Sequence, residues 1–292
     1  MPGGMGVWIE AGRGASAGRR ERVGQMSAAF RSTGAQRAPV GPAGPLRRMW
    51  QRHAARLCPV CGEFTRFAGF TANRRESGLC TVCGAFNRQR QMAYAVRLLT
   101  GQDMRGPFRF DPAFRTFSAE AWGPLARALG GHPGHVGAEY FGPDHRPGER
   151  IEGTRHEDLC HLSFAAGALD LVLSSDVLEH LQDPYAAHRE IHRVLKPGGR
   201  HIFTVPFREG AAQDDIRACR QDGQTVHLAE PLYHADPVAP GGRGVLVWTV
   251  FGAEMGRKIA ALGFEFRSLR LWRPRYGIIG RGALVFCATR RG

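Results

Sequence analysis

Lysine is almost absent from this sequence of 292 residues: of 40 basic residues, only Lys196 and Lys258 are lysines. Long apolar runs are absent too, and the longest, Val245 to Phe251, is far shorter than the roughly 20 residues of a membrane-spanning helix. Glycine and arginine interrupt the N-terminal apolar stretches, unlike those of a signal peptide. We therefore expect a cytoplasmic protein without a membrane span. A transit peptide, which is also arginine-rich and acid-poor, is the alternative.

Acidic residues are scarce in the first third of the chain. The net charge is +14, from 40 Lys and Arg against 26 Asp and Glu. Residues 1–50 and residues 51–100 each hold eight arginines and two glutamates, whereas residues 101–292 hold 24 basic and 22 acidic groups. A strongly basic protein usually suggests a nucleic-acid partner. Because the last two thirds are nearly neutral, the net charge says little about the substrate of that part.

Residues 1–46 contain mainly Gly, Ala, Arg, Ser and Pro, with no sustained hydrophobic period. Such a segment buries too little apolar surface to offset the entropy of ordering, so we expect it to be disordered. A basic arm that orders on RNA is the alternative.

Four of the seven cysteines form two closely spaced pairs. Cys58 and Cys61 lie in CPVCG, Cys80 and Cys83 lie in CTVCG, and 18 residues separate the pairs. This spacing is typical of four-cysteine zinc sites, in which two turns bring four thiolates into a tetrahedron. Four sulfurs leave no coordination position open, so we expect structural zinc in a zinc-ribbon-like module over residues 47–86. Two redox pairs are the alternative.

Residues 87–111 are expected to form a helical connector, because apolar residues recur at helical spacing from Asn87 to Leu99. Its arginines, Arg88, Arg90 and Arg97, fit the solvated face of that helix, with phosphate contact as the alternative.

Strand and helix patterns alternate from about residue 112 onward, which is typical of a doubly wound α/β sheet. Asp183 and Pro184 are a helix-start signal, and the Lys196–Gly199 turn is a stop signal. The expected strands are 115–119, 135–141, 168–174 and 200–205, and the expected helices are 124–129, 183–195 and 254–262.

The segment from Asp170 to Phe207, DLVLSSDVLEHLQDPYAAHREIHRVLKPGGRHIFTVPF, resembles the core of class I S-adenosylmethionine-dependent methyltransferases of the type-11 group. In that group a strand ends in a V-L-E-H-type turn, and L-K-P-G-G leads into the next strand. The resemblance extends over residues 112–290 and includes HEDLCHLSF, His156 to Phe164. It implies a Rossmann-like methyltransferase sheet with an antiparallel last strand.

The resemblance also implies an S-adenosylmethionine site beyond the carboxyl ends of the strands. Glu139 ends the second strand and would accept hydrogen bonds from the ribose hydroxyls, unless it is only a solvated charge. Asp158, with the Leu159 backbone, matches the position that reads the adenine amino group. Ser174 and Ser175 end the fourth strand, where the family contacts the methionine part of the cofactor.

The family's glycine-rich turn after the first strand is altered in this chain. The segment SAEAWG, Ser118 to Gly123, has one glycine where the family has an E/D-x-G-x-G pattern. We expect Ser118, Glu120 and Gly123 to contact the cofactor, with Trp122 pointing away from it.

Asp176, Glu179 and His180 follow the fourth strand at the mouth of the expected cleft. Methylation of oxygen or nitrogen requires loss of a proton, and histidine is a suitable general base near neutral pH. His180 is therefore the predicted base, Glu179 its orienting partner and Asp176 a substrate contact. A purely structural cap of the turn is the alternative for Glu179 and His180.

Residues 207–248 form a probable insertion over the acceptor. It includes YHADP, which resembles the Y-H-x-D-P segment of methyltransferases encoded among glycan-building enzymes. We expect His234 and Asp236 to contact the substrate, with a plain surface loop as the alternative.

The sequence thus predicts a methyltransferase for a small-molecule or glycan acceptor, with S-adenosylmethionine as cofactor and a structural zinc ion. One alternative is an RNA methyltransferase whose basic zinc module grips RNA, which would make binding strongly salt-dependent. Another is a non-catalytic member of the fold that binds a partner protein.

Overall fold

The computed structural model describes residues 7–10, 56–236, 238, 241–280 and 283–292. Of the segment expected to be disordered, only β1 (Val7–Glu10) is among them, and it pairs with an edge of the main sheet. The rest of residues 1–46 and residues 47–55 of the expected zinc module lie outside the described residues.

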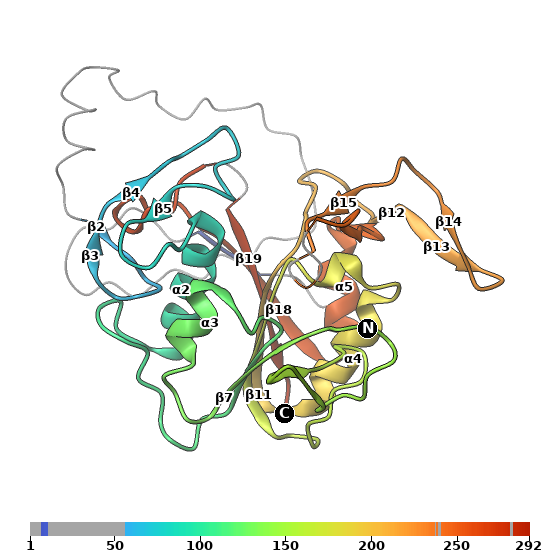
Figure 1. Ribbon diagram of the computed structural model, residues 1–292, viewed down its shortest axis with the longest axis horizontal. Coiled ribbons are helices and arrows are strands. Elements are labelled where there is room, and N and C mark those ends of the chain that lie inside the picture. Colours follow the sequence, from blue (N-terminus) through green and yellow to red (C-terminus); the bar gives the residue numbers. More distant parts are fainter. Residues whose placement is uncertain (1–6, 11–55, 237, 239–240, 281–282) are drawn as a thin grey trace.

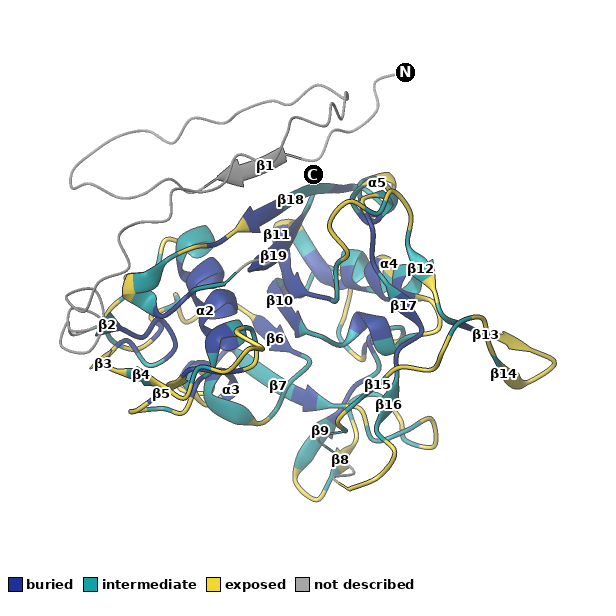
Figure 2. Ribbon diagram, turned by 90° about the horizontal axis from the view of Figure 1, so that it is seen from above, coloured by how far each residue is buried: buried dark blue, intermediate teal, exposed yellow. Residues whose placement is uncertain are grey.

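A nine-stranded sheet forms the centre of the described chain (Figures 1 and 2). Besides β1, its strands are β6 (Thr116–Ser118), β7 (His135–Glu139), β8 (Arg150–Ile151), β9 (Thr154–His156), β10 (Leu169–Ser175), β11 (Leu195–Thr204), β18 (Phe264–Arg270) and β19 (Leu284–Arg290). They lie in the order β1-β18-β19-β11-β10-β6-β7-β9-β8. β19 is antiparallel to both neighbours, and the strands from β11 to β9 are parallel. The predicted α/β class with an antiparallel last strand is confirmed.

Helices cover both faces of this sheet (Figure 1). α2 (Asn87–Thr100) and α3 (Gly123–Leu129) lie on one face, and α4 (Pro184–Val194) and α5 (Glu254–Ala261) lie on the other. Successive residues of β10 supply the two cores: Leu171 and Leu173 pack with α2 and α3, whereas Val172 packs with α4 and α5. This alternation is what a strand buried on both faces requires.

The start of α4 follows the sequence signal. The Asp183 carboxylate accepts hydrogen bonds from the Tyr185 and Ala186 amides, and Pro184 occupies the first turn, where its missing N–H costs nothing. The end differs from the expectation. β11 begins at Leu195, not Arg200, because Leu169 pairs with Leu195 and Leu171 with Arg200, so the glycine turn between them bulges from one continuous strand.

The four cysteines lie in the head, which we define as residues 56–86. It contains two short hairpins, β2 (Arg56–Leu57) with β3 (Phe64–Thr65), and β4 (Phe67–Ala68) with β5 (Leu79–Cys80). The buried side chains of the head form one core with α2 and the adjoining face of the sheet. The head therefore packs into the same body as the sheet and is not a separately folded module.

Arg90 and Arg97 are fully buried, so the expectation of a solvated arginine face is wrong for both. Arg90 donates hydrogen bonds to the Gly78 and Ala85 carbonyls of the head and to the Gly277 carbonyl beyond β18. Arg97 donates to the Pro59 carbonyl within the first cysteine pair. Buried guanidinium groups persist when their donors find acceptors. Here backbone carbonyls accept from both side chains, and only Arg90 Nε lacks an acceptor within the described residues.

Replacing Arg90 by alanine should destabilise the protein by about 2 kcal/mol, because three carbonyls lose a donor in a buried site. Urea unfolding measures this loss. Arg109→Ala is the matched control, since Arg109 is exposed and its replacement should lower the free energy of unfolding by less than about 0.5 kcal/mol. Equal urea concentrations at the unfolding midpoint for the two variants would contradict the structural role of Arg90.

The insertion contributes β12 (Asp215–Ile216), β13 (Ala218–Gln221), β14 (Gln224–His227), β15 (Tyr233–His234) and β16 (Val245–Leu246), and β17 (Thr249–Val250), which pairs with β12, follows directly after it. The hairpin β13–β14 projects into solvent (Figures 1 and 2), whereas β15 and β16 pair close to the turn η1 (Leu178–His180). A second short turn, η2 (Pro274–Tyr276), lies beside the head. Among the residues that the structure describes, no helix has the length and hydrophobicity that a bilayer span requires.

Candidate active site

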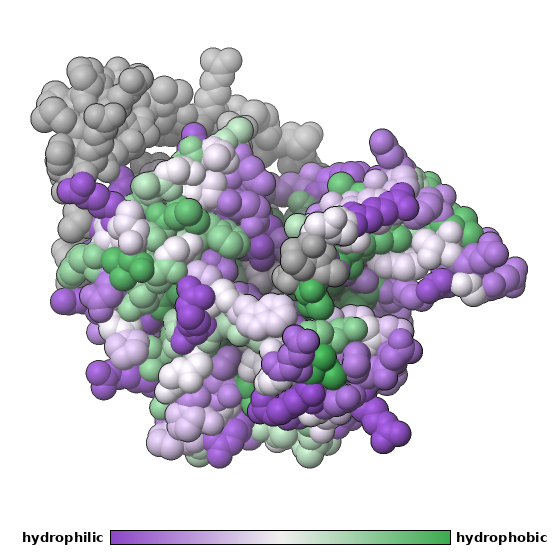
Figure 3. Space-filling model, viewed as in Figure 1, coloured by the Kyte–Doolittle hydropathy of each residue, from purple (hydrophilic) through white to green (hydrophobic). Residues whose placement is uncertain are grey.

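A cleft of about 1870 Å³ lies where the strand order reverses, between β6 and β10. The chain moves outward from β6 through β7 and β9 in one direction and from β10 to β11 in the other, so the loops after β6 and β10 diverge. This is where open α/β sheets bind ligands. Figure 3 shows the recess between the head side and the insertion side. Typical small-molecule sites occupy about 300–1,000 Å³, so the cleft has room for two ligands.

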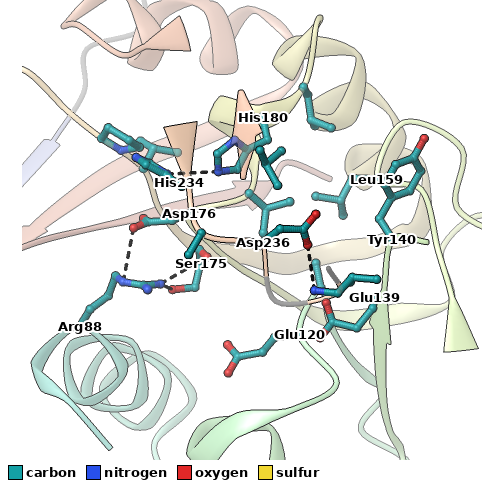
Figure 4. Close-up of a pocket in the computed structure, with 18 of the residues that line it drawn as sticks. Arg88, Glu120, Glu139, Tyr140, Leu159, Ser175, Asp176, His180, His234 and Asp236 are labelled. Carbon is teal, nitrogen blue, oxygen red and sulfur yellow. Dashed lines mark hydrogen bonds and ion pairs between the residues drawn. The ribbon is translucent and has the colours of Figure 1, made fainter. Parts of the chain in front are cut away.

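Two carboxylates form one end of the cleft (Figure 4). Glu139 ends β7, and its Oε1 accepts a hydrogen bond of 2.8 Å from the Ala121 amide. Glu120 follows β6, and burial raises its pKa to about 7; the Glu139 charge adds to this effect and Arg88 opposes it. Burial also raises the pKa of Glu139. Two carboxylates this close favour a cationic or hydroxyl-rich ligand.

Gly123 lets the altered turn approach these acids. Its φ of +91° favours glycine, and a Cβ there would lie 2.8 Å from Glu120 Oε1. The Ser118 side chain donates to the Glu120 carbonyl (2.7 Å) and is buried outside the cleft lining, so it holds the turn. Trp122 lines the cleft and packs its edge against Phe141, with ring centroids 6.3 Å apart.

Asp158 and Leu159 line the adjoining wall. The Asp158 Oδ1 accepts a hydrogen bond of 2.8 Å from the Cys160 amide, which fixes the carboxylate within its loop. Tyr140 stands on the same side of the cleft and is half exposed (Figure 4). Sequence reasoning did not select Tyr140, although its position directly after Glu139 at a strand end was a signal for it.

The two serines at the end of β10 face opposite sides of the sheet. Ser175 lines the cleft, and its side-chain oxygen accepts a hydrogen bond from the Arg88 guanidinium. Ser174 is buried on the opposite face, where its Oγ lies 2.9 Å from His201 Nε2. The structure therefore places Ser174, an expected cofactor contact, in the core and outside the cleft lining.

Asp176 anchors the head to the cleft. Both of its carboxylate oxygens accept hydrogen bonds from Arg75 of the head, and Thr204 donates to Oδ1 (2.9 Å). Burial alone would raise the pKa of Asp176, but Arg75 and Arg88 outweigh it and lower the pKa to about 2. Because both Asp176 oxygens already accept hydrogen bonds from protein side chains, Asp176 is better suited to holding the head against the cleft than to the expected contact with substrate. Sequence reasoning missed Arg75.

Glu179, His180 and His234 form a compact cluster. The two histidines lie at the other end of the cleft (Figure 4). His180 Nε2 lies 3.2 Å from His234 Nδ1, and Glu179 Oε1 lies 3.4 Å from the same nitrogen. Glu179 is fully buried, and burial raises its pKa; contact with Glu179 raises the pKa of His234. η1 and the insertion thus bring together residues predicted separately as a catalytic pair and a substrate contact.

Asp236 lies nearer the acidic end of the cleft. It follows β15, and its Oδ1 accepts a hydrogen bond of 2.8 Å from the Val238 amide. Its charge contributes to the raised pKa of Glu139. The insertion therefore reaches both ends of the cleft, with His234 at one and Asp236 at the other (Figure 4).

The four head cysteines also form a cluster. Their sulfur atoms lie within 4.8 Å of one another, and the Cys58 and Cys83 sulfurs are 3.8 Å apart. In a tetrahedron with zinc–sulfur bonds of about 2.3 Å, neighbouring sulfurs are about 3.8 Å apart. The thiols are not joined in disulfides, and their arrangement fits a zinc ion.

Residues 140–203 match the family model described as a methyltransferase domain. Over 80 residues the chain is 38% identical to the uncharacterized protein YafE of Escherichia coli (strain K12), which is 27% of this chain and 36% of that protein. Over 61 residues it is 34% identical to an arsenite methyltransferase of Aquipseudomonas alcaligenes, which is 21% of this chain and 18% of that protein. The chain thus spans about a third or less of these relatives.

Two solved methyltransferases are similar to the chain at low identity. One is an S-adenosylmethionine-dependent methyltransferase from Mesorhizobium loti, at 17% identity and a TM-score of 0.41, covering 68% of this chain and 98% of that one. The other is a 1,6-didemethyltoxoflavin-N1-methyltransferase from Burkholderia thailandensis, at 17% and 0.42, covering 70% and 78%. Because the family match covers 140–203, it is β8 to β11, with Glu179 and His180 between them, that resemble a methyltransferase domain.

Proposed function

We propose that this chain is an S-adenosylmethionine-dependent methyltransferase for a small-molecule or glycan-type acceptor. The observation that carries the proposal is the row of polar groups along the cleft at the strand-order reversal. Glu120, Glu139, Asp158 and Ser175 follow four neighbouring parallel strands and all line that cleft. Such a row suits an elongated ligand with an adenine, a ribose and a charged amino-acid end.

The residues present fit this cofactor. Glu139 is placed to accept hydrogen bonds from ribose hydroxyls, while Asp158 and the Leu159 backbone take the adenine. Glu120, beside Gly123 and Ser175, takes the cationic methionine end. When bound, S-adenosylmethionine supplies a methyl group activated by a positively charged sulfur. The partly buried carboxylate of Glu120 accepts a hydrogen bond of 3.5 Å from Gln89 Nε2, and its raised pKa supports a cationic neighbour.

The acceptor belongs at the end of the cleft covered by the insertion. His180 and His234 line it, and Glu179 lies behind them. This cluster is the group of side chains best placed to handle the proton that the acceptor loses. Asp236 extends the polar lining toward the cofactor end and suits hydroxyl-bearing acceptors.

Calorimetry with S-adenosylmethionine and S-adenosylhomocysteine tests the cofactor assignment, and we expect one molecule bound per chain. Transfer of a labelled methyl group into fractionated cell extract tests the activity and identifies the acceptor fraction. No heat of binding at millimolar cofactor would refute the proposal and favour a non-catalytic binding protein.

Cofactor binding should tighten about tenfold between pH 6 and pH 8. Glu120 has a pKa of about 7, so its ionised fraction rises from roughly a tenth to roughly nine tenths over that range. Only the ionised form attracts the cationic methionine end. Calorimetry across this range measures the effect, and Glu120→Gln reports the titration of the cofactor itself. An equal pH dependence in both proteins would contradict this role.

The head carries structural zinc in this proposal. RNA as the acceptor is less well supported, because the arginines of α2 already donate hydrogen bonds within the protein. Arg90 and Arg97 donate to backbone carbonyls, and Arg88 donates to Ser175 and Glu76. Filter binding of total RNA at two salt concentrations separates the alternatives. Strong, salt-sensitive retention would favour RNA.

A further inference from the structure

We propose that Glu179, His180 and His234 bind a divalent transition-metal ion at the acceptor end of the cleft, separate from the zinc of the head. The inference deepens the proposed function, on which it rests for the identity of the acceptor, by giving the cluster a specific role. It concerns three side chains that come from η1 and from β15 of the insertion, 54 residues apart in the sequence.

The three ligand atoms are spaced as around one ion. His180 Nε2 and His234 Nδ1 are 3.2 Å apart, His234 Nδ1 and Glu179 Oε1 are 3.4 Å apart, and His180 Nε2 and Glu179 Oε1 are 3.8 Å apart. Ligands at about 2.0–2.2 Å from a tetrahedral ion lie about 3.4 Å from one another. The atoms therefore converge on a common centre and need only small adjustments.

Glu179 gives an independent reason to expect a cation. Its side chain is fully buried, and neither carboxylate oxygen accepts a well-aligned hydrogen bond. A carboxylate is rarely buried without a partner, because the lost hydration is not replaced. The basic side chains printed nearest to Glu179 Oε1 are the two other members of the cluster, His234 at 3.4 Å and His180 at 3.8 Å, whereas Arg75 and Arg88 pair with Asp176. A metal ion between the two imidazoles would provide the missing charge.

The backbone prepares His180 for this role. Its Nδ1 lies 2.9 Å from the Leu246 carbonyl of β16, and a carbonyl only accepts, so Nδ1 carries the proton and Nε2 presents its lone pair to the cluster. Hydrogen bonding of the second ring nitrogen to a carbonyl is typical of metal-ligating histidines. Without an ion, the His234 Nδ1 proton bridges the two rings; binding requires this proton to leave Nδ1.

The donor set selects the class of ion. Two imidazoles and one carboxylate suit zinc, manganese and iron(II), whereas magnesium prefers oxygen ligands. Three protein ligands leave at least one coordination position, and His180 and His234 face the cleft. The ion thus points to an acceptor with a hydroxyl group, whose pKa falls on coordination. With the ion bound, the two imidazoles are ligands and the cluster acts on the proton by lowering the hydroxyl pKa instead of accepting it. The hydroxyl proton passes to solvent, the oxygen bonds to the methyl carbon, and the carbon–sulfur bond breaks with its electron pair left on sulfur.

Manganese(II) and cobalt(II) are suitable probes, because manganese competes poorly for the thiolates of the zinc-loaded head. Titration of the full-length, zinc-loaded protein, followed by electron paramagnetic resonance for manganese and visible absorption for cobalt, should give one ion per chain. His234→Asn should weaken binding at least tenfold, and so should Glu179→Gln. His227→Asn, on the exposed hairpin strand β14, is the matched control and should bind as the unchanged protein does.

Each outcome bears on one proposal. S-adenosylhomocysteine binding, measured on every variant, reports whether the fold and the cofactor site persist; His234 is half-buried, so His234→Asn covers the case in which Glu179→Gln fails to fold. No binding of either ion at millimolar concentration, or equal binding by the His234→Asn and His227→Asn variants, overturns the metal site and leaves the methyltransferase proposal standing. Metal binding without cofactor binding supports the metal site and overturns the methyltransferase.

Discussion

Replacing Cys58 and Cys80 together by serine should abolish zinc binding and unfold the head. The two sulfurs are the buried members of the cluster, and a structural four-thiolate site contributes on the order of 10 kcal/mol to the folding of a small module. A segment of this size has too little core to remain folded without such a contribution. The apparent melting temperature should fall by on the order of 10 °C, because the head shares its core with α2 and the sheet.

The same substitutions should weaken cofactor binding at least tenfold. Arg75 belongs to the head, and its loss frees Asp176 at the end of β10, beside Ser175. Zinc content by elemental analysis, proteolysis of the head and calorimetry with S-adenosylhomocysteine measure the three effects. Cys219→Ser, on the projecting hairpin, is the control and should change none of them. Retention of stoichiometric zinc in the double variant would refute the metal assignment.

The sequence predicts the sheet well because its signals are local. Alternation within β10, the Asp183 cap of α4 and the two cysteine pairs each depend on residues that lie close together along the chain. Local patterns fix which segments become strands, and the expected strands start or end within three residues of β6, β7 and β10. β11 is the exception, because a bulge joins the predicted turn to the strand.

The side-chain contacts within the cleft are less predictable, because they join residues that lie far apart in the sequence. Arg75 and Asp176 are 101 residues apart, and nothing in their local sequences links them. Strand geometry also matters: both Ser174 and Ser175 were expected at the cofactor, but adjacent strand residues face opposite sides, so only Ser175 lines the cleft. The solvated face expected for Arg90 is wrong, because arginine on a helix is usually solvated and nothing local announces the Gly277 carbonyl, 187 residues away, that accepts from its guanidinium.

Replacing Glu139 by alanine should weaken cofactor binding by at least 100-fold. Hydrogen bonds to a charged acceptor contribute about 1.5–3 kcal/mol each, and two ribose hydroxyls would lose theirs, whereas tenfold in affinity corresponds to about 1.4 kcal/mol. Glu139→Gln keeps one acceptor oxygen and should lose about tenfold. Calorimetry with S-adenosylhomocysteine gives both dissociation constants.

Two control measurements show whether weaker cofactor binding by Glu139→Ala comes from a lost contact with the ligand. Glu265→Ala removes a carboxylate on β18, remote from the cleft lining and paired with Arg267, and should leave the affinity unchanged. Thermal unfolding separates a lost contact from a disturbed turn, because Glu139 also accepts the Ala121 amide. If Glu139→Ala binds within threefold of the unchanged protein, the ribose is held elsewhere, and the acidic end of the cleft then belongs to the acceptor. If the affinity for the cofactor falls while the melting temperature is unchanged, the Glu139 carboxylate contacts the ligand directly. The order of adenine, ribose, methyl group and acceptor along the cleft then follows the order of the strands.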